Sequence, residues 1–478
     1  MKSTTHRVIY GEMRNRVPAL VLLSLVGAAC GDDGAPAPQL EIVGHDPLLS
    51  RGMNAAPAIV GDTMYIGSRT EGGTHDDAGV LIVDISDPAN PNVVGQIGPP
   101  DEGLLGMTSR ELRAVPDKNL LIVLNFACST EIHACTRDTN QFGARGTPEP
   151  NNIKLYDVSD PRAPALISRV DIGVVNFLRS IVPHEFYLWR DPTDADRILL
   201  LFSSPISAPS FRVLDISDPA DVQTVVTWDP FEAGIVDEPA GENAILHSVS
   251  TTDDGGLAFL SMTGAGLSII DTGEIADGVI NPAIRPLTQP DTRIDYSPPH
   301  HPGTHSAVPV PGRSLVVVTD EVYGVPIAEG CPWGWARLVD YANPSRPSIV
   351  SEMKAPQNEV DCPASNGPEL TSFTAHNSTV TANLALITWH SAGLRAWDIE
   401  DAANSVEVAK LKPEPLDSVA VEDPALGGDP LLMWSYPIIK DGLIYVVDIR
   451  NGLYVVRYTG PHEEEIAGTV FSEGNSNL

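Results

Sequence analysis

The sequence has few cysteines and few basic side chains, and each shortage argues against a class of protein. Five cysteines occur in 478 residues and none forms a C-x-x-C pair, which argues against a zinc site. Only 30 lysines and arginines oppose 63 aspartates and glutamates, a formal charge of −33. Such a surface repels phosphate backbones and anionic lipid, so nucleic acid is not an expected partner. We attribute the excess of acidic residues to solubility, and the alternative is that they collect cations.

Several catalytic signatures are also missing. The chain contains no G-x-S-x-G, P-loop, G-x-G-x-x-G or H-E-x-x-H motif, so hydrolase, nucleotide-binding and zincin mechanisms have no support. Proline and glycine are abundant instead, with 42 and 40 copies that fall between short apolar runs. Residues of this kind mark turns, and their spacing leaves room for few long helices.

The N-terminal segment resembles a bacterial lipoprotein signal. Two arginines precede an apolar run over residues 17–29, which is too short to span a bilayer, and the run ends in LVGAAC, similar to a lipobox. We predict a signal peptide over 1–29, lipidation of Cys30 as a membrane anchor, and a flexible tether over 30–38. A transmembrane anchor or a buried helix is the alternative, and Met13 is an alternative start.

Four cysteines remain once Cys30 is assigned to lipid. An even number in an exported chain favours two disulfides, most simply Cys128 with Cys135 and Cys331 with Cys362. A zinc site formed by these cysteines is the alternative. Trp333 and Trp335, close behind Cys331, are expected in a surface insertion braced by the second disulfide.

Apolar segments recur along the chain as a repeat. Residues 257–271 (LAFLSMTGAGLSIID) and 384–398 (LALITWHSAGLRAWD) align without a gap, each with two strand-like runs around a glycine-containing turn. The second of these runs recurs seven times, starting at Gly79, Asn152, Phe211, Leu267, Ala336, Leu394 and Leu453. A further short strand follows most copies, so the repeat has three inner strands and an outer fourth, as a propeller blade does.

We therefore predict an all-β protein, a seven-bladed β-propeller of four-stranded antiparallel blades over residues 39–461 with a C-terminal tail over 462–478. Residues 39–47 have the form of an outer strand without inner strands. Such a strand would complete the last blade, close the ring and remove an exposed edge. The segment 465–471 competes for the same position.

The turn that follows the third strand carries Asp-Pro pairs, at Asp87, Asp160 and Asp218. Aspartate accepts backbone N–H bonds in turns and proline ends a strand, so these residues are expected to form turns, with calcium binding as the alternative. The sequence VLIVDISDPANP at 80–91 resembles the signature of LVIVD-repeat proteins, a family of predicted β-propellers common in bacterial surface lipoproteins. The resemblance covers nearly all of the chain after Ala55, and the fourth and seventh repeats lose the turn motif. It implies the propeller fold and a place in the bacterial cell envelope, at the outer membrane or cell surface.

Histidines recur at the start of four consecutive blades, where first strands line the central channel. They are His184, His247, His305 and His376. Four neutral imidazoles on one axis could hold a first-row metal such as Cu, Fe or Zn, with an open position for substrate or oxygen. Carotenoid oxygenases and selenium-binding, methanethiol oxidase-like propellers resemble this arrangement in architecture only. The alternative is that each histidine ends a loop and bonds to backbone near the channel mouth.

The corresponding positions of the other blades carry different residues. We assign them to Ala55 in the first blade, Leu112 or Arg113 in the second, and Ser435 or Tyr436 in the seventh. His300, His301 and His390 are expected to be loop histidines.

The function predicted from the sequence is that of a lipid-anchored scaffold that displays a binding surface for a protein or glycan outside the cytoplasm. The alternative, from a different class, is a metal-dependent, oxidase-like enzyme that uses the central histidines.

Overall fold

The described strands form four four-stranded antiparallel sheets, an eight-stranded sheet, a five-stranded sheet and a two-stranded hairpin. The eight-stranded sheet consists of two groups of four strands joined by one residue pair, Ser68 with Ser109, and we count these groups as separate sheets. The structure is a computed structural model, and it describes residues 39–478 apart from 137–150, 173, 177–178, 181–182, 206–208, 237–243, 295–302, 323–332, 359–372 and 425–428. These residues belong to one unit that runs from Pro38 to Leu478. Cys30, Cys331, Cys362, His300 and His301 lie outside the described residues, so the predictions made for them stay predictions.

We number the sheets in chain order. Sheet 1 contains β2 (Asn54–Val60), β3 (Thr63–Ser68), β4 (Val80–Asp84) and β5 (Asn92–Ile97), and sheet 2 contains β6 (Met107–Val115), β7 (Leu120–Ala127), β8 (Asn152–Asp157) and β9 (Ala165–Asp171). Sheet 3 contains β12 (Glu185–Arg190), β13 (Ile198–Ser203), β14 (Phe211–Asp215) and β15 (Gln223–Trp228). Sheet 4 contains β16 (Ile245–Thr251), β17 (Leu257–Thr263), β18 (Gly266–Asp271) and β19 (Arg285–Pro286).

The last three sheets follow the same order. Sheet 5 contains β20 (Thr304–Pro309), β21 (Leu315–Asp320), β22 (Ala336–Asp340) and β23 (Ser348–Met353), and sheet 6 contains β24 (Ser378–Val380), β25 (Leu384–Thr388), β26 (Leu394–Asp398) and β27 (Val406–Leu411). Sheet 7 contains β28 (Ile438–Lys440), β29 (Leu443–Asp448), β30 (Gly452–Thr459) and β1 (Gln39–Asp46).

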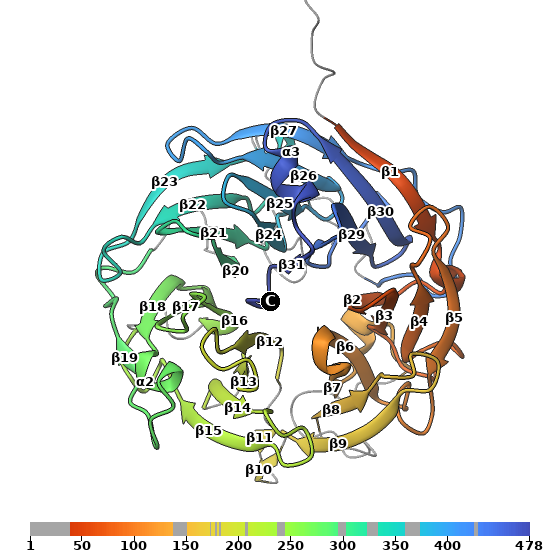
Figure 1. Cartoon of the computed structure of the whole chain (residues 1–478), viewed down its shortest axis with the longest axis horizontal. Coiled ribbons are helices and arrows are strands. Elements are labelled where there is room, and N and C mark those ends of the chain that lie inside the picture. The colour runs from red at the N-terminus through yellow and green to blue at the C-terminus, as the bar shows by residue number, and fades with distance from the viewer. Residues whose placement is uncertain are drawn as a thin grey trace, which may run out of the picture. The chain divides into compact units, whose positions relative to one another are not determined.

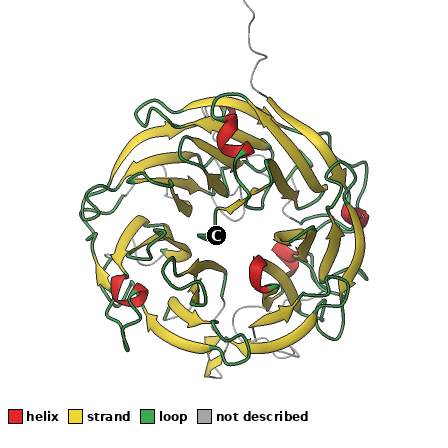
Figure 2. Cartoon of the chain, viewed as in Figure 1, coloured by secondary structure: helices red, strands yellow, loops and turns green. Residues whose placement is uncertain are grey.

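The sheets surround a common centre, an arrangement consistent with propeller blades. First strands such as β6, β12, β16 and β20 lie toward the centre and the fourth strands lie at the rim (Figure 1). Within the described ranges, helix is confined to short segments such as α1 (Thr130–His133), α2 (Gly273–Ala276) and α3 (Glu463–Ala467), as Figure 2 shows. A two-stranded hairpin, β10 (Val174–Asn176) and β11 (Arg179–Ser180), lies between sheets 2 and 3 in the chain.

Neighbouring sheets cover each other's faces, which explains the continuous apolar runs of the inner strands. All five residues of β25 are buried, and its leucines pack with Ile439 and Val446 of the next sheet. The outer strand β9 is mostly exposed or half-buried. A strand with both faces covered has no polar face, so its sequence reads as an unbroken apolar run.

Aspartates of the exit turns bond to the backbone two residues on, as predicted. The carboxylate of Asp87 accepts from the Ala89 N–H at 3.1 Å, that of Asp160 from Arg162 at 3.1 Å and that of Asp218 from Ala220 at 3.0 Å. The predicted role of these residues in turns is confirmed.

The N-terminal strand completes the last sheet. In β1, Gln39 pairs with Thr459 and Asp46 with Leu453 of β30, so the prediction that residues 39–47 supply the outer strand of the last blade is confirmed. The competing segment lies elsewhere: it contributes to α3 and to β31 (Phe471–Glu473), which pairs with the other edge of the sheet at β28.

The C-terminal residues run on into the centre of the fold, where Figure 1 marks the end of the chain. The Leu188 N–H donates to the Asn475 carbonyl at 3.0 Å, and the Asn477 side chain bonds to the backbone N–H and carbonyl of Arg190 at 2.7 and 2.8 Å. The tail therefore links sheet 7 to sheet 3 along the inner strands.

Cys128 and Cys135 form the predicted disulfide. The expectation for Trp333 and Trp335 is wrong, because both indoles are buried, with 3% and 6% exposure. Trp335 donates from Nε1 to Glu352 at 3.1 Å and lies under the guanidinium of Arg337. No helix of the described residues has the length and apolarity needed to cross a membrane.

Replacing Leu40 by aspartate is expected to destabilise the protein by about 3 kcal/mol or more, because the change places a charge in the core between sheets 6 and 7. Leu40 is 6% exposed, whereas Ile42 of the same strand is 39% exposed. Ile42→Asp is therefore the matched control and should cost under about 1 kcal/mol. Urea unfolding measures both, and equal losses would contradict the closing role of β1.

Candidate metal centre

The four predicted histidines lie at the same end of consecutive first strands. His184 directly precedes β12, His247 lies in β16, His305 lies in β20 and His376 comes two residues before β24. His247 and His305 are the unpaired residues of β-bulges, since pairing with the second strand skips from Leu246 to Ser248 and from Thr304 to Ser306. A bulge turns one side chain away from the regular alternation of a strand.

Hydroxyl groups hold the backbone of three of the four histidines against the preceding sheet. Ser203 of sheet 3 donates to the His247 carbonyl at 2.5 Å, Ser248 donates to the His305 carbonyl, and Ser306 donates to the His376 carbonyl at 3.2 Å. These bonds repeat from sheet to sheet and fix the backbone position from which each of these imidazole side chains extends.

The four imidazoles form a continuous series. Nε2 of His184 lies 2.8 Å from Nε2 of His247. The ring centroids of His247 and His305 are 4.0 Å apart, and those of His305 and His376 are also 4.0 Å apart. The structure thus brings together all four residues, each in contact with the next.

Two carboxylates and a fifth histidine that the sequence reasoning did not place here complete the cluster. The Glu321 carboxylate lies 3.2 Å from Nε2 of His376, 3.4 Å from Nε2 of His390 and 3.5 Å from Nε2 of His305. His390 does lie in a turn, but it is 2% exposed and its ring centroid is 4.9 Å from that of His376. Its predicted place in the turn is confirmed, but nothing in the sequence indicated that it belongs to this cluster.

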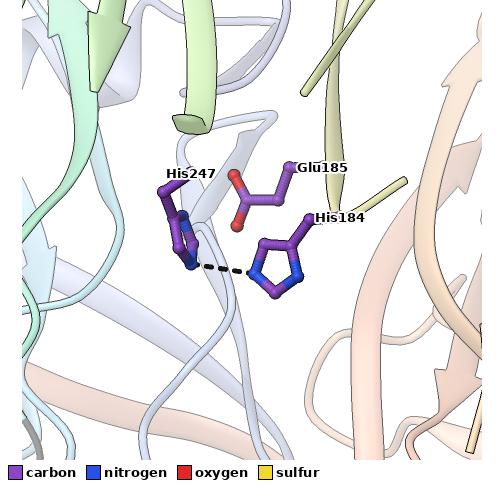
Figure 3. A group of neighbouring side chains, drawn as sticks. All are labelled: His184, Glu185 and His247. Carbon is purple, nitrogen blue, oxygen red and sulfur yellow. Dashed lines mark hydrogen bonds between the residues drawn. The ribbon is translucent and has the colours of Figure 1, made fainter. Parts of the chain in front are cut away.

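Among the described residues, three overlapping groups have ligand atoms within 4.8 Å of one another. They are His184, Glu185 and His247; His247, His305 and Glu321; and Glu321, His376 and His390. Figure 3 shows the first group, with the Glu185 carboxylate directed toward the space beside the two rings. None of these groups contains all four of the predicted histidines.

Residues 74–97, which include β4 and β5 of sheet 1, match the family model described as the LVIVD repeat. The chain contains an LVIVD repeat. A crystal structure of a protein from Lactobacillus plantarum, from a structural genomics consortium, is similar at 11% identity and a TM-score of 0.44, over 75% of this chain and 85% of that chain. No curated protein matches the sequence. Neither match names an activity.

The tautomer of His376 is fixed by its hydrogen-bond partner on the side away from Glu321. Nδ1 lies 2.6 Å from the Trp434 carbonyl oxygen, which only accepts hydrogen bonds, so Nδ1 carries the proton. In the neutral ring Nε2 then carries a lone pair, and this lone pair faces the Glu321 carboxylate. Metal-ligating histidines in proteins commonly have this kind of backbone partner.

Burial keeps the imidazoles neutral. It lowers the pKa of His247 and of His376 to about 4, and it lowers the pKa values of His184 and His305 well below the ordinary value. Neutral imidazole is the form that binds metals.

The pKa values of the two carboxylates shift in opposite directions. Burial, followed by repulsion from Glu111, raises the pKa of Glu185 well above its usual range. Burial would also raise the pKa of Glu321, but attraction to a positive charge on His376 or His305 outweighs that effect and holds it well below the usual value. Glu321 is therefore ionised.

The spacing of donor atoms around Glu321 suits a small metal ion. Two ligands bound at about 2.0–2.1 Å in tetrahedral geometry are separated by about 3.3 Å. The distances from Glu321 to His376 and His390 are 3.2 and 3.4 Å. Two histidines and one carboxylate form the ligand set of non-haem iron sites.

Proposed function

We propose that this protein is a seven-bladed β-propeller of the LVIVD-repeat family whose centre binds a first-row transition metal. The seven numbered sheets around one centre and the closing strand β1 support the fold, and the match over residues 74–97 supports the family. Glu321, His376 and His390 are the ligands, and His305 lies beside them.

The observation that carries this proposal is the contact between His376 and Glu321. Nε2 of a neutral His376 and a carboxylate oxygen face each other at 3.2 Å with lone pairs on both atoms. Such a pair is repulsive unless a cation lies between the atoms. A proton could serve, but burial lowers the pKa of His376 to about 4, so a proton is a poor occupant at neutral pH. A metal ion bound by both atoms removes the repulsion.

The ligand set favours an oxidase-like enzyme over a purely structural metal site. A metal held by three side chains keeps coordination positions open for a substrate or for oxygen. Around that position the chain's own groups orient the ligands: the Trp434 carbonyl fixes the ring of His376, and Glu321 reaches three imidazoles at once. Copper, iron and zinc are the metals to test.

Elemental analysis of the purified soluble chain tests the proposal directly. We expect about one first-row transition metal per chain, or stoichiometric uptake of Fe(II), Cu(II) or Zn(II) by chelator-treated protein. A chain that contains no metal and takes up none of the three would contradict the proposal. The cluster would then be a structural feature, and the function would be that of a binding scaffold for a protein or glycan.

We also propose that the protein is anchored in the bacterial cell envelope by lipid on Cys30. The lipobox-like LVGAAC and the acidic, proline-containing segment behind it support this location. Cys30→Ser is expected to move the protein from the membrane fraction to the soluble fraction, because the change removes the acceptor for the acyl chains that hold it. Cell fractionation with immunoblotting measures this, and a variant that stays wholly in the membrane fraction would exclude the anchor.

A further inference from the structure

Two buried guanidinium groups lie beside the histidine cluster. Arg110 is the bulge residue of β6, since pairing with β7 skips from Ser109 to Glu111. It thus takes in sheet 2 the position that His247 and His305 take in sheets 4 and 5. Arg69 directly follows β3 of sheet 1.

Both guanidinium groups lie over the same indole. The Cζ atom of Arg69 is 5.1 Å from the centroid of the Trp434 ring, and that of Arg110 is 5.3 Å from it. The Trp434 ring is in turn 5.2 Å from the ring of His376. One aromatic side chain therefore separates the two cations from the proposed metal ligand.

Arg69 is buried without the hydrogen bonds that a buried arginine normally makes. It is 3% exposed, its Nε is 4.0 Å from the Asp423 carboxylate, and neither its Nε nor its Nη1 has a hydrogen-bond acceptor among the described residues. Arg51, which is 1% exposed, donates to Asn54 and to backbone carbonyls of Ile66, Gly67, Asp77 and Gly79. The fold can satisfy a buried guanidinium, so the open donors of Arg69 need another explanation.

An oxyanion would supply hydrogen-bond acceptors for Nε and Nη1 of Arg69. A buried cation with unmet donors costs several kcal/mol, and a carboxylate or phosphate group meets a guanidinium fork with two parallel hydrogen bonds. Trp434 holds the planar groups in place by cation–π contact, so little side-chain entropy remains to be lost on binding.

We propose that Arg69 and Arg110, held over Trp434, form an oxyanion-binding site beside the metal centre, and that the substrate is a small acid with a carboxylate or phosphate group. The assignment of that acid as a substrate rests on the proposed metal-dependent function. The anion site itself does not, because none of its three residues is a metal ligand.

Isothermal titration of chelator-treated protein with inorganic phosphate, and separately with acetate, tests the site at constant ionic strength. We expect one saturable site per chain for at least one of the two anions. Arg69→Met should weaken its binding at least about tenfold, because the bidentate contact is lost. Arg69→Lys keeps the charge and should also weaken binding, because an ammonium cannot form the fork.

Arg395→Met is the matched control. Arg395 is 3% exposed and lies over Trp389, but it pairs with Glu407 within sheet 6, so the anion affinity should match that of the unaltered protein. Circular dichroism shows whether each variant is folded. If Arg69→Met is not folded, the anion affinity of Arg69→Lys decides the outcome. Absence of binding for both anions, or unchanged affinity in the folded Arg69 variant, would overturn the proposal. Metal content is measured on each preparation before chelator treatment, so failure of the metal centre is recognised separately.

Discussion

Glu321→Gln is expected to lower the affinity of the protein for its metal by about 100-fold or more, so that the purified variant contains almost none. The change keeps the size of the side chain but replaces the ionised carboxylate of Glu321 by a neutral amide. Metal content after dialysis against a defined metal buffer measures the effect. Retention of a full equivalent of metal would contradict the assignment of Glu321 as a ligand.

Three further variants locate the metal along the series of imidazoles. His390→Gln should lose metal nearly as strongly as Glu321→Gln, since His390 belongs to the same group of ligand atoms. His184→Gln should keep it, because His184 lies at the other end of the series. His462→Gln is a control for histidine–carboxylate contacts in general, because His462 lies 3.3 Å from Asp398 away from the cluster. The opposite result for His184 and His390 would move the site to His184, Glu185 and His247.

His247→Gln is expected to reduce the loss of stability of the metal-free protein on acidification from about pH 6.5 to about pH 4. Burial lowers the pKa of His247 to about 4, whereas an unfolded histidine titrates near 6.5. Above pH 6.5 both states are neutral and the residue contributes no pH dependence. Between the two values the unfolded state binds a proton that the folded state does not, so stability falls by about 1.4 kcal/mol per pH unit as the pH decreases.

The measurement is the difference in unfolding free energy between the metal-free protein and His247→Gln, from urea titrations at pH 7.5, 6.5, 5.5 and 4.5. The difference isolates the histidine, because Glu185, whose raised pKa acts in the opposite direction, is present in both proteins. Between pH 7.5 and 6.5 this free-energy difference should change little compared with its change below pH 6.5. Parallel curves down to pH 4.5 would show that His247 is not buried as a neutral ring.

The sequence by itself determined the repeated sheets and the level at which the first-strand histidines lie. The gapless repeat between residues 257–271 and 384–398 defines the pairs β17–β18 and β25–β26, and the aspartate turns and the strand at 39–47 follow from local chemistry and from the need to cover a sheet edge. His184, His247, His305 and His376 come together because equivalent positions in consecutive sheets face one centre.

Glu321 and His390 were missed although a topological rule points to them. In an antiparallel pair, the end of the second strand lies beside the beginning of the first. Glu321 directly follows β21, and His390 comes two residues after β25, so both lie at the level of His305 and His376. The prediction of the four histidines rests on equivalent positions in first strands, and a residue on another strand has no equivalent in such an alignment.

Only the tertiary structure decided which residue of sheet 2 lies at the histidine level. The sequence analysis assigned Leu112 or Arg113, and this is wrong, because the bulge lies at Arg110. A bulge adds one unpaired residue and reverses which side chains face the centre, and nothing in the local sequence marks it. The burial of Trp333 and Trp335 was also decided by the tertiary structure. So was the course of the C-terminal residues across the inner strands. Both depend on contacts between segments far apart in the chain, which strand periodicity does not encode.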